Sequence, residues 1–271
     1  AEIIHQQTYD WTTVFSGNVI RTLNPLPDLH CVNVAHGLKA PVIYYQQHSH
    51  QKYINAVKSG LSALRDCHGF VNGMYGGDEQ LHGNEPSQGS ELCTAVEMMY
   101  SFESILPITG DIYYADYLEK IAYNVLPTQS TDDYMARQYF QQANQVQITL
   151  EDRNFMNQYR TGLVYGTTIG YPCCTANMHQ GWPKYVQNLW YATADDGIAA
   201  LIYGASEVNV TVSGGHKVKI KEQTDYPFNE KINFSFHLKD KVKFPFHLRI
   251  PSWCKSASIT INRKLINVDI I

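Results

Sequence analysis

The hydrophobic pattern of the 271-residue chain changes its period once, near residue 196, and this change constrains the fold more than any other feature. Up to about Tyr191, apolar residues recur three and four positions apart, which is the spacing of an amphipathic α-helix. After the Asp-Asp-Gly turn at 195–197, apolar and polar residues alternate in short runs separated by Gly, Asp, Asn and Pro, which is typical of β-strands. The sequence therefore predicts a helical unit over 1–195, followed by an antiparallel β-sandwich of at least five strands over 196–271.

The helical unit is predicted to consist of helices joined in pairs by short loops, as in a bundle, a solenoid or an α/α barrel. We expect Pro107 to end one of these helices and Pro127 to end the next. The first of the two helices carries an apolar stripe formed by Leu92, Val96, Met99, Phe102 and Leu106. The helical part is short for a closed barrel, and the last strands break off without a closing partner, so we expect an incomplete barrel and a truncated sandwich.

Composition excludes two classes of partner. The chain is 44% hydrophobic and 17% charged, as expected of a globular protein. Its net charge is −4 and it has no stretch rich in Lys and Arg, so we expect no nucleic-acid partner. No apolar run reaches the length of a membrane span, so we expect no membrane partner either. The sequence predicts no particular oligomeric state.

Two adjacent cysteines, Cys173 and Cys174, follow a proline in a chain that has six cysteines. Adjacent cysteines rarely form a disulfide with each other because the bond strains the peptide between them, so a shared third partner is expected. Glu91 and Cys93 lie two positions apart, which places side chains on one side of an extended segment but not of a helix. We therefore expect this pair just before or in the first turn of the helix that carries the apolar stripe.

These four residues form a donor set of three thiolates and one carboxylate, which suits Zn²⁺ best among the common ions. The spacing leaves an alternative open, because buried or merely reactive cysteines would show the same pattern. The other three cysteines, Cys31, Cys67 and Cys254, are expected to pack as small apolar groups.

The segment GMYGGDEQLHGNEPSQGSELCTAVEMMYSFE, followed about 80 residues later by YPCCTANMHQGW, resembles the bacterial β-L-arabinofuranosidase family, glycoside hydrolase family 127 and its relatives. The resemblance runs from about Cys31 to Arg249 and implies an (α/α)6 barrel followed by β-sandwich domains. It implies a retaining glycosidase that releases β-L-arabinofuranose or a related sugar from plant-type glycans. The resemblance places the zinc ligands at Glu91, Cys93, Cys173 and Cys174, the nucleophile at Cys173 and the general acid/base at Glu79.

A retaining glycosidase needs a nucleophile on one face of the sugar and a proton donor on the other. Metal ligation would keep Cys173 deprotonated, and Glu79 would first donate a proton to the leaving oxygen and later deprotonate the attacking water. Glu79 lies 12 positions before Glu91, a shorter spacing than in characterised relatives. Asp78 and Glu85 are therefore alternatives for the acid/base role.

Several side chains are candidates for binding a glycan or oligosaccharide substrate. His36 resembles a barrel histidine of the family that reaches the sugar, although a histidine on an apolar helix is more often a core residue. The remaining candidates lie close to the proposed centre in sequence or could stack on a sugar ring, with a core or surface role as the alternative: His82, His179, Tyr171, Trp182 and Tyr139.

Two other functions remain open. Zinc could join two helix starts in a purely structural role. The chain could also be a non-catalytic carbohydrate-binding fragment, since the resemblance leads us to expect that the N-terminal half of the family's barrel is missing here. Any export signal would precede residue 1, so localisation stays open, with a bacterial periplasmic or secreted location favoured over the cytoplasm.

Overall fold

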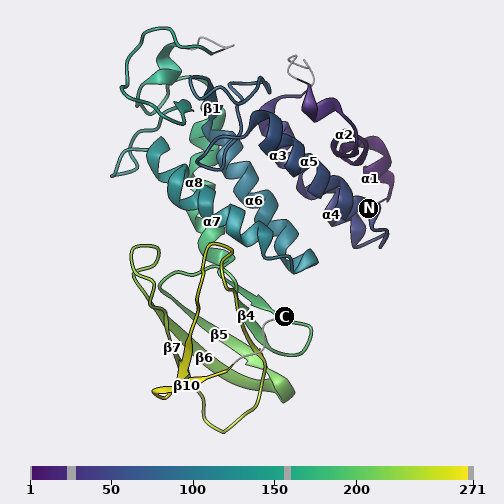
Figure 1. Ribbon diagram of the computed structural model, residues 1–271, viewed down its shortest axis with the longest axis vertical. Helices are drawn as coiled ribbons and strands as arrows, with labels where there is room; N and C mark the ends of the chain where they lie inside the picture. Colours follow the sequence, from purple (N-terminus) through teal and green to yellow (C-terminus); the bar gives the residue numbers. More distant parts are fainter. Residues whose placement is uncertain (1, 23–28, 156–159, 268–271) are drawn as a thin grey trace. The chain divides into compact units, whose positions relative to one another are not determined.

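The computed structural model describes residues 2–22, 29–155 and 160–267, and the chain divides into two compact units, 1–189 and 190–271. The first unit is helical and the second is built from small, mainly antiparallel sheets, which confirms the predicted order of helices before strands (Figure 1). The second unit begins at Trp190, whereas alternation was expected from residue 196. Its first strand, β3 (Trp190–Ala192), is three residues long and mostly apolar, so its sequence shows no alternation.

One helix organises the helical unit. Helix α6 (Leu92–Thr109) packs against α3, α4, α7 and α8, and 12 of its 18 residues are buried. A helix enclosed by neighbours is apolar on most of its surface, which explains why the buried residues extend beyond the predicted stripe. The other helices of this unit are α1 (Glu2–Gln7), α2 (Trp11–Ser16), α3 (Cys31–Gly37), α4 (Lys39–Tyr45), α5 (Lys52–His68), α7 (Tyr113–Asn124) and α8 (Pro172–Gln187), with 3-10 turns η1 (Val19–Arg21), η2 (Leu126–Gln129) and η3 (Arg160–Leu163).

The ends of α6 and α7 differ from the ends predicted at Pro107 and Pro127. Helix α6 continues through Pro107 and ends at Gly110, whose φ of 64° is the left-handed conformation that glycine adopts at a helix C-terminus. Pro107 lies within the last turn of the helix, so only two helical residues follow it and a distortion at the proline affects little of the helix. Helix α7 ends at Asn124, before Pro127, which belongs to the 3-10 turn η2.

A short antiparallel strand pair connects the start of α6 to a distant part of the helical unit. Strand β1 (Gly89–Glu91) pairs antiparallel with β2 (Phe140–Gln142), so Glu91 lies opposite Phe140. The amide of Leu92 donates to the carbonyl of Tyr139 at 3.1 Å. Residues 91 and 139, almost fifty positions apart, are therefore held side by side at the start of α6.

The β unit contains two three-stranded sheets, β3-β4-β8 and β5-β6-β7, and the pair β9-β10. Ile198 of β4 and Val212, Val218 and Ile220 of the other sheet share one hydrophobic core. The expectation that all strands pair antiparallel is wrong for one pair, because β4 and β8 run parallel. The strands are β4 (Ile198–Ala200), β5 (Ser206–Val212), β6 (His216–Gln223), β7 (Asn233–His237), β8 (Phe246–Leu248), β9 (Ile259–Ile261) and β10 (Lys264–Ile266), with the 3-10 turn η4 (Ser213–Gly215) between β5 and β6.

No helix in the described part of the chain combines the length and the apolar character needed to cross a membrane.

Candidate metal centre

Glu91, Cys93, Cys173 and Cys174 meet in one cluster, although about 80 residues separate the two pairs. One ligand atom from each residue lies within 4.8 Å of the other three. The Cys93 and Cys174 sulfurs are 3.2 Å apart. Oε1 of Glu91 lies 3.7 Å from the sulfur of Cys173 and 3.5 Å from that of Cys174. Both pairs are thus brought within reach of a single ion.

The local backbone explains how each pair presents its side chains. Glu91 is the extended residue before α6 (φ −87°, ψ 142°), and Cys93 lies in the first turn of that helix. Tyr171 is likewise extended before α8, which begins at Pro172, so the two adjacent cysteines lie in its first turn. The positive end of each helix dipole therefore points at the cluster, where it favours thiolates.

The donor geometry fits a tetrahedral cation. Bonds of about 2.0–2.3 Å from zinc to oxygen and sulfur give a tetrahedron whose donor–donor edges are about 3.5–3.8 Å. The two sulfur–oxygen separations of 3.5 and 3.7 Å fall within this range, and the sulfur–sulfur separation of 3.2 Å is about 0.6 Å shorter than the sulfur–sulfur edge. A disulfide would need sulfurs about 2.05 Å apart, and all six cysteines are free. The cluster could therefore hold a metal ion.

The cluster concentrates acidic groups in a buried space. Burial, together with the charge of Glu79, raises the pKa of Glu91 to about 7. Burial also raises the pKa of Cys174 well above its ordinary value. Hydrogen bonds from Cys174 and then Cys93 lower the pKa of Cys173. A cation beside these donors would favour their ionised forms.

Tyr139 links Glu79 to the cluster by contacting both Glu79 and Cys173. The hydroxyl of Tyr139 donates to Oε1 of Glu79 at 2.9 Å and lies 3.6 Å from the sulfur of Cys173. The carboxylate oxygen and the sulfur are therefore at most about 6.5 Å apart, a limit that includes the separation of about 5–5.5 Å between the two catalytic groups of retaining glycosidases. The Glu79 carboxylate and the Cys173 sulfur thus both contact the Tyr139 hydroxyl.

The backbone of Glu79 is strained. Its φ is 96°, a region that residues other than glycine rarely occupy and that costs about 1–3 kcal/mol. The amide of Cys31 holds this conformation by donating to the carbonyl of Glu79 at 2.7 Å. Strained backbone conformations of this kind are common at functional sites, where contacts with surrounding residues maintain them.

Asp78 and Glu85, the two alternatives to Glu79 for the acid/base role, do not contact the cluster in the same way. Asp78 is fully buried and its Oδ1 lies beside Nε2 of His82, whose other ring nitrogen lies 2.7 Å from Oε1 of Gln88. Glu85 is exposed on the loop. Among the three carboxylates, Glu79 is the one whose contacts lead to Cys173.

The candidate substrate-binding residues are divided among several places. Tyr171 lies beside the cluster, with its ring 6.3 Å from the ring of Tyr139. The contacts of His36 go to Glu97 at 2.8 Å and Lys39 at 3.1 Å, and those of His82 hold the loop around Asp78. His179 and Trp182 line a hollow of about 550 Å³ beside α8.

His30 is a site residue that the sequence did not indicate. Its Nε2 lies 2.5 Å from Oε2 of Glu79 and 3.7 Å from Oε2 of Glu91. The hydrogen bond with Glu79 raises the pKa of His30. The neighbouring Cys31 is fully buried, as expected, and its sulfur lies 3.8 Å from Glu91. No local motif marks His30, because its partners lie 49 and 61 positions further along the chain.

Comparison with protein families gives two matches. Residues 12–187 match the model of the β-L-arabinofuranosidase GH127 catalytic domain. Residues 197–269 match the model of the β-L-arabinofuranosidase GH127 middle domain. None of the curated proteins matches the chain.

Solved structures show the same fold at low sequence identity. A GH127 β-L-arabinofuranosidase from Geobacillus stearothermophilus T6 aligns over 88% of this chain and 38% of its own, with a TM-score of 0.76 and 18% identity. A structure described as a glycoside hydrolase aligns over 89% of this chain and 43% of its own, with a TM-score of 0.70 and 18% identity. A GH127 β-arabinofuranosidase aligns over 99% of this chain and 46% of its own, with a TM-score of 0.71 and 16% identity. The chain thus spans less than half the length of each of these structures.

Proposed function

Because the chain belongs to glycoside hydrolase family 127, we propose that it carries the active centre of a retaining glycosidase that releases β-L-arabinofuranose or a related sugar from a glycan. The observation that carries this proposal is the path from Glu79 through the Tyr139 hydroxyl to the sulfur of Cys173. In this proposal the helices form part of an (α/α)6 barrel.

Cys173 is the nucleophile. Its sulfur is the most acidic of the three thiols and is exposed, so a sugar can reach it. Glu91, Cys93, Cys173 and Cys174 would hold a zinc ion, which when bound keeps the thiols ionised and limits the negative charge of the centre. The Cys173 sulfur attacks the anomeric carbon and forms a carbon–sulfur bond while the bond to the leaving oxygen breaks.

Glu79 moves the protons. In the first step its carboxyl group donates a proton to the leaving oxygen, and in the second it takes a proton from the water that displaces Cys173 from the sugar. Two displacements at one carbon return the original anomeric configuration. Tyr139 and His30 orient the carboxylate by contacting one oxygen each.

The proposal is tested by measuring hydrolysis of an aryl β-L-arabinofuranoside together with bound zinc. Glu79→Gln is expected to lower turnover by about 10²–10⁴-fold without loss of zinc, because Glu79 is not among the four donors. Glu85→Gln makes the same charge change on the exposed part of the same loop and should leave turnover unchanged. Cys173→Ser should abolish turnover while most of the fold survives.

A structural role for the metal has a specific observation in its favour, because three of the four donors are fully buried and join the starts of α6 and α8. In that case Cys173→Ser and Cys93→Ser would lower the melting temperature and zinc content together, and Glu79→Gln would change no measured property. A wild-type chain that binds an arabinofuranoside without hydrolysing it would support the carbohydrate-binding alternative.

A further inference from the structure

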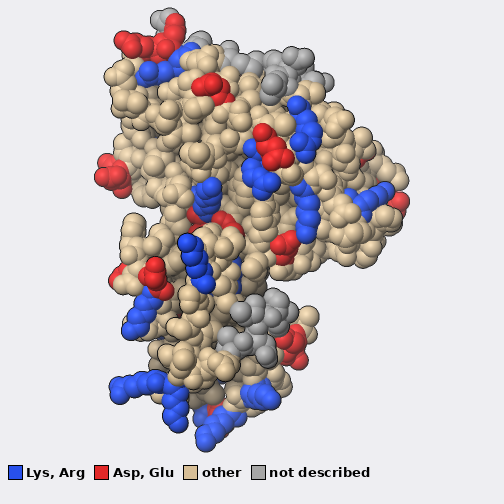
Figure 2. All heavy atoms as spheres, viewed as in Figure 1, with Lys and Arg blue, Asp and Glu red and all other residues tan. Residues whose placement is uncertain are grey.

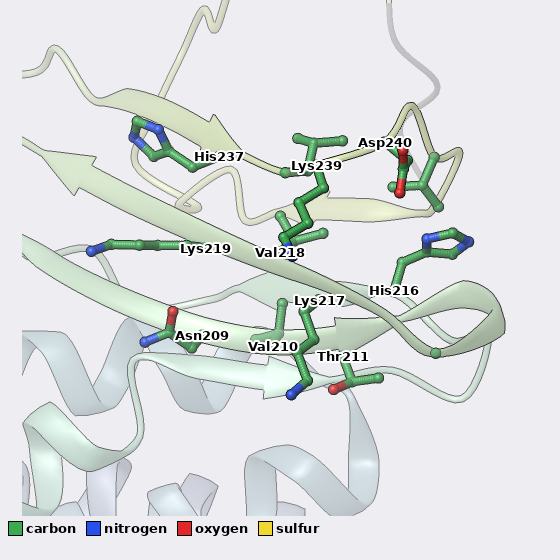
Figure 3. A pocket seen from close by; sticks show the side chains of 13 residues that line it. Asn209, Val210, Thr211, His216, Lys217, Val218, Lys219, His237, Lys239 and Asp240 are labelled. Carbon is green, nitrogen blue, oxygen red and sulfur yellow. The ribbon is translucent and has the colours of Figure 1, made fainter.

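The β unit contains a cationic hollow that the proposed glycosidase activity does not use. It has a volume of about 820 Å³ and lies over β5, β6 and the segment that follows β7 (Figure 3). Asp240 is the one carboxylate in its lining. The basic residues that line it are His216, Lys217, Lys219, His237 and Lys239.

The strand register explains why Lys217, Lys219 and His237 lie on one face of the sheet. In β6, Val218 and Ile220 are buried in the core, so the alternating residues Lys217 and Lys219 are exposed on the opposite side. Lys219 pairs in register with His237 of β7 on one side and with Asn209 of β5 on the other. The pleat therefore sets basic and neutral polar side chains in rows across one face of the sheet.

The positive charge of this face is largely uncompensated. Lys219 forms an ion pair with Glu207 at 2.6 Å, whereas no ion pair within the described residues involves Lys217 or Lys239. Residues 190–271 hold eleven Lys and Arg against eight Asp and Glu, while residues 1–189 hold ten against seventeen. Figure 2 shows Lys and Arg gathered over the strands on the face in view. The hollow is thus a basic site in an acidic chain.

We propose that this hollow binds an acidic glycan, a polymer of uronate sugars whose carboxylates meet the lysines. Charge complementarity selects a polyanion. The amide of Asn209 and the hydroxyl of Thr211 can bond sugar hydroxyls. The lining contains no Phe, Tyr or Trp, the side chains that offer a large stacking surface to a neutral sugar. The choice of a glycan among polyanions rests on the proposed function.

The test uses the full chain and polygalacturonate as the probe, with binding measured by calorimetry at several salt concentrations. The variant Lys217→Gln/Lys239→Gln is expected to bind about five- to thirtyfold more weakly. The control Lys231→Gln/Lys255→Gln removes the same charge from exposed positions of the β unit outside the hollow and should bind like the wild type. Affinity of the wild type should fall as salt rises.

Several results would overturn the proposal: no binding of polygalacturonate, equal loss in both double variants, or tighter binding of single-stranded DNA or of phosphatidylglycerol vesicles. Equal binding of a neutral arabinan would also overturn it. Circular dichroism of each variant checks that it is folded. Hydrolysis of the aryl arabinofuranoside is measured separately, so failure of the binding proposal and failure of the catalytic proposal are distinguishable.

Discussion

Glu103 is a carboxylate in the middle of α6 that is only 2% exposed, and its two oxygens find no hydrogen-bond partner among the described residues. Burial raises its pKa from 4.5 to about 8, and the charge of Lys184 opposes this shift only in part. The folded chain therefore binds one more proton than the unfolded chain between these two pH values. The contribution of Glu103 to stability is fully present below about pH 4.5 and is lost as the pH rises toward 8.

Glu103→Gln is expected to remove this pH dependence, because glutamine keeps the shape of the side chain without the charge. The variant should gain about 1–3 kcal/mol of unfolding free energy relative to the wild type at pH 8 and much less at pH 5. Urea unfolding at both pH values measures the difference. Glu85→Gln serves as the exposed control, and an equal gain in both variants would show that the effect does not come from burial.

At the scale of elements, the start of α8 depends on a glycine. Gly170 has a φ of 59°, and a Cβ atom there would lie 2.8 Å from Cγ of the Tyr139 ring. Gly110, at the end of α6, has a similar φ of 64°, and a Cβ atom there would meet nothing within 4 Å. Comparing an alanine substitution at each glycine therefore distinguishes the free-energy cost of the left-handed backbone from the cost of displacing Tyr139.

Both Gly110→Ala and Gly170→Ala should destabilise the chain by about 1 kcal/mol through backbone strain. Gly170→Ala should lose a further amount of about 1–3 kcal/mol because alanine overlaps Tyr139. Its turnover should also fall, since Tyr139 contacts Glu79. Denaturant unfolding and hydrolysis assays measure the two effects. Equal destabilisation of the two variants would contradict the close packing of Gly170 against Tyr139.

At the scale of the whole molecule, a bound metal would join segments far apart in the chain. The ligands lie at residues 91–93 and 173–174, all in the helical unit. A ligand that binds only the folded state stabilises it by about 2.7 kcal/mol at a concentration of 100 Kd. Removal of the metal should therefore affect the two units differently.

Chelation is expected to speed amide hydrogen exchange in the first turns of α6 and α8 and to leave β5 and β6 unchanged. Hydrogen–deuterium exchange with mass spectrometry measures this, and added zinc should restore slow exchange. The strands act as the internal control. Uniform acceleration in both units, or none in either, would contradict a metal centre confined to the helical unit.

Local patterns predicted part of this structure well. The order of helices before strands follows from hydrophobic period, which each segment carries in its own sequence. The details that differ depend on neighbours: α6 continues through Pro107, β3 is too short to show alternation, and β4 pairs in parallel with β8. A three-residue strand is defined by the strand beside it and not by its own composition.

The sequence by itself determined the class of each segment and supplied the candidate donors, because periodicity and residue chemistry are local properties. Tertiary structure alone decided that Glu91, Cys93, Cys173 and Cys174 lie within 4.8 Å of one another. It also decided that Glu79, and not Asp78 or Glu85, reaches Tyr139, and that His30 joins them. These contacts depend on how β1 pairs with β2 and how α6 packs against α8. Such packing is set by the whole buried core and is not encoded in any single segment.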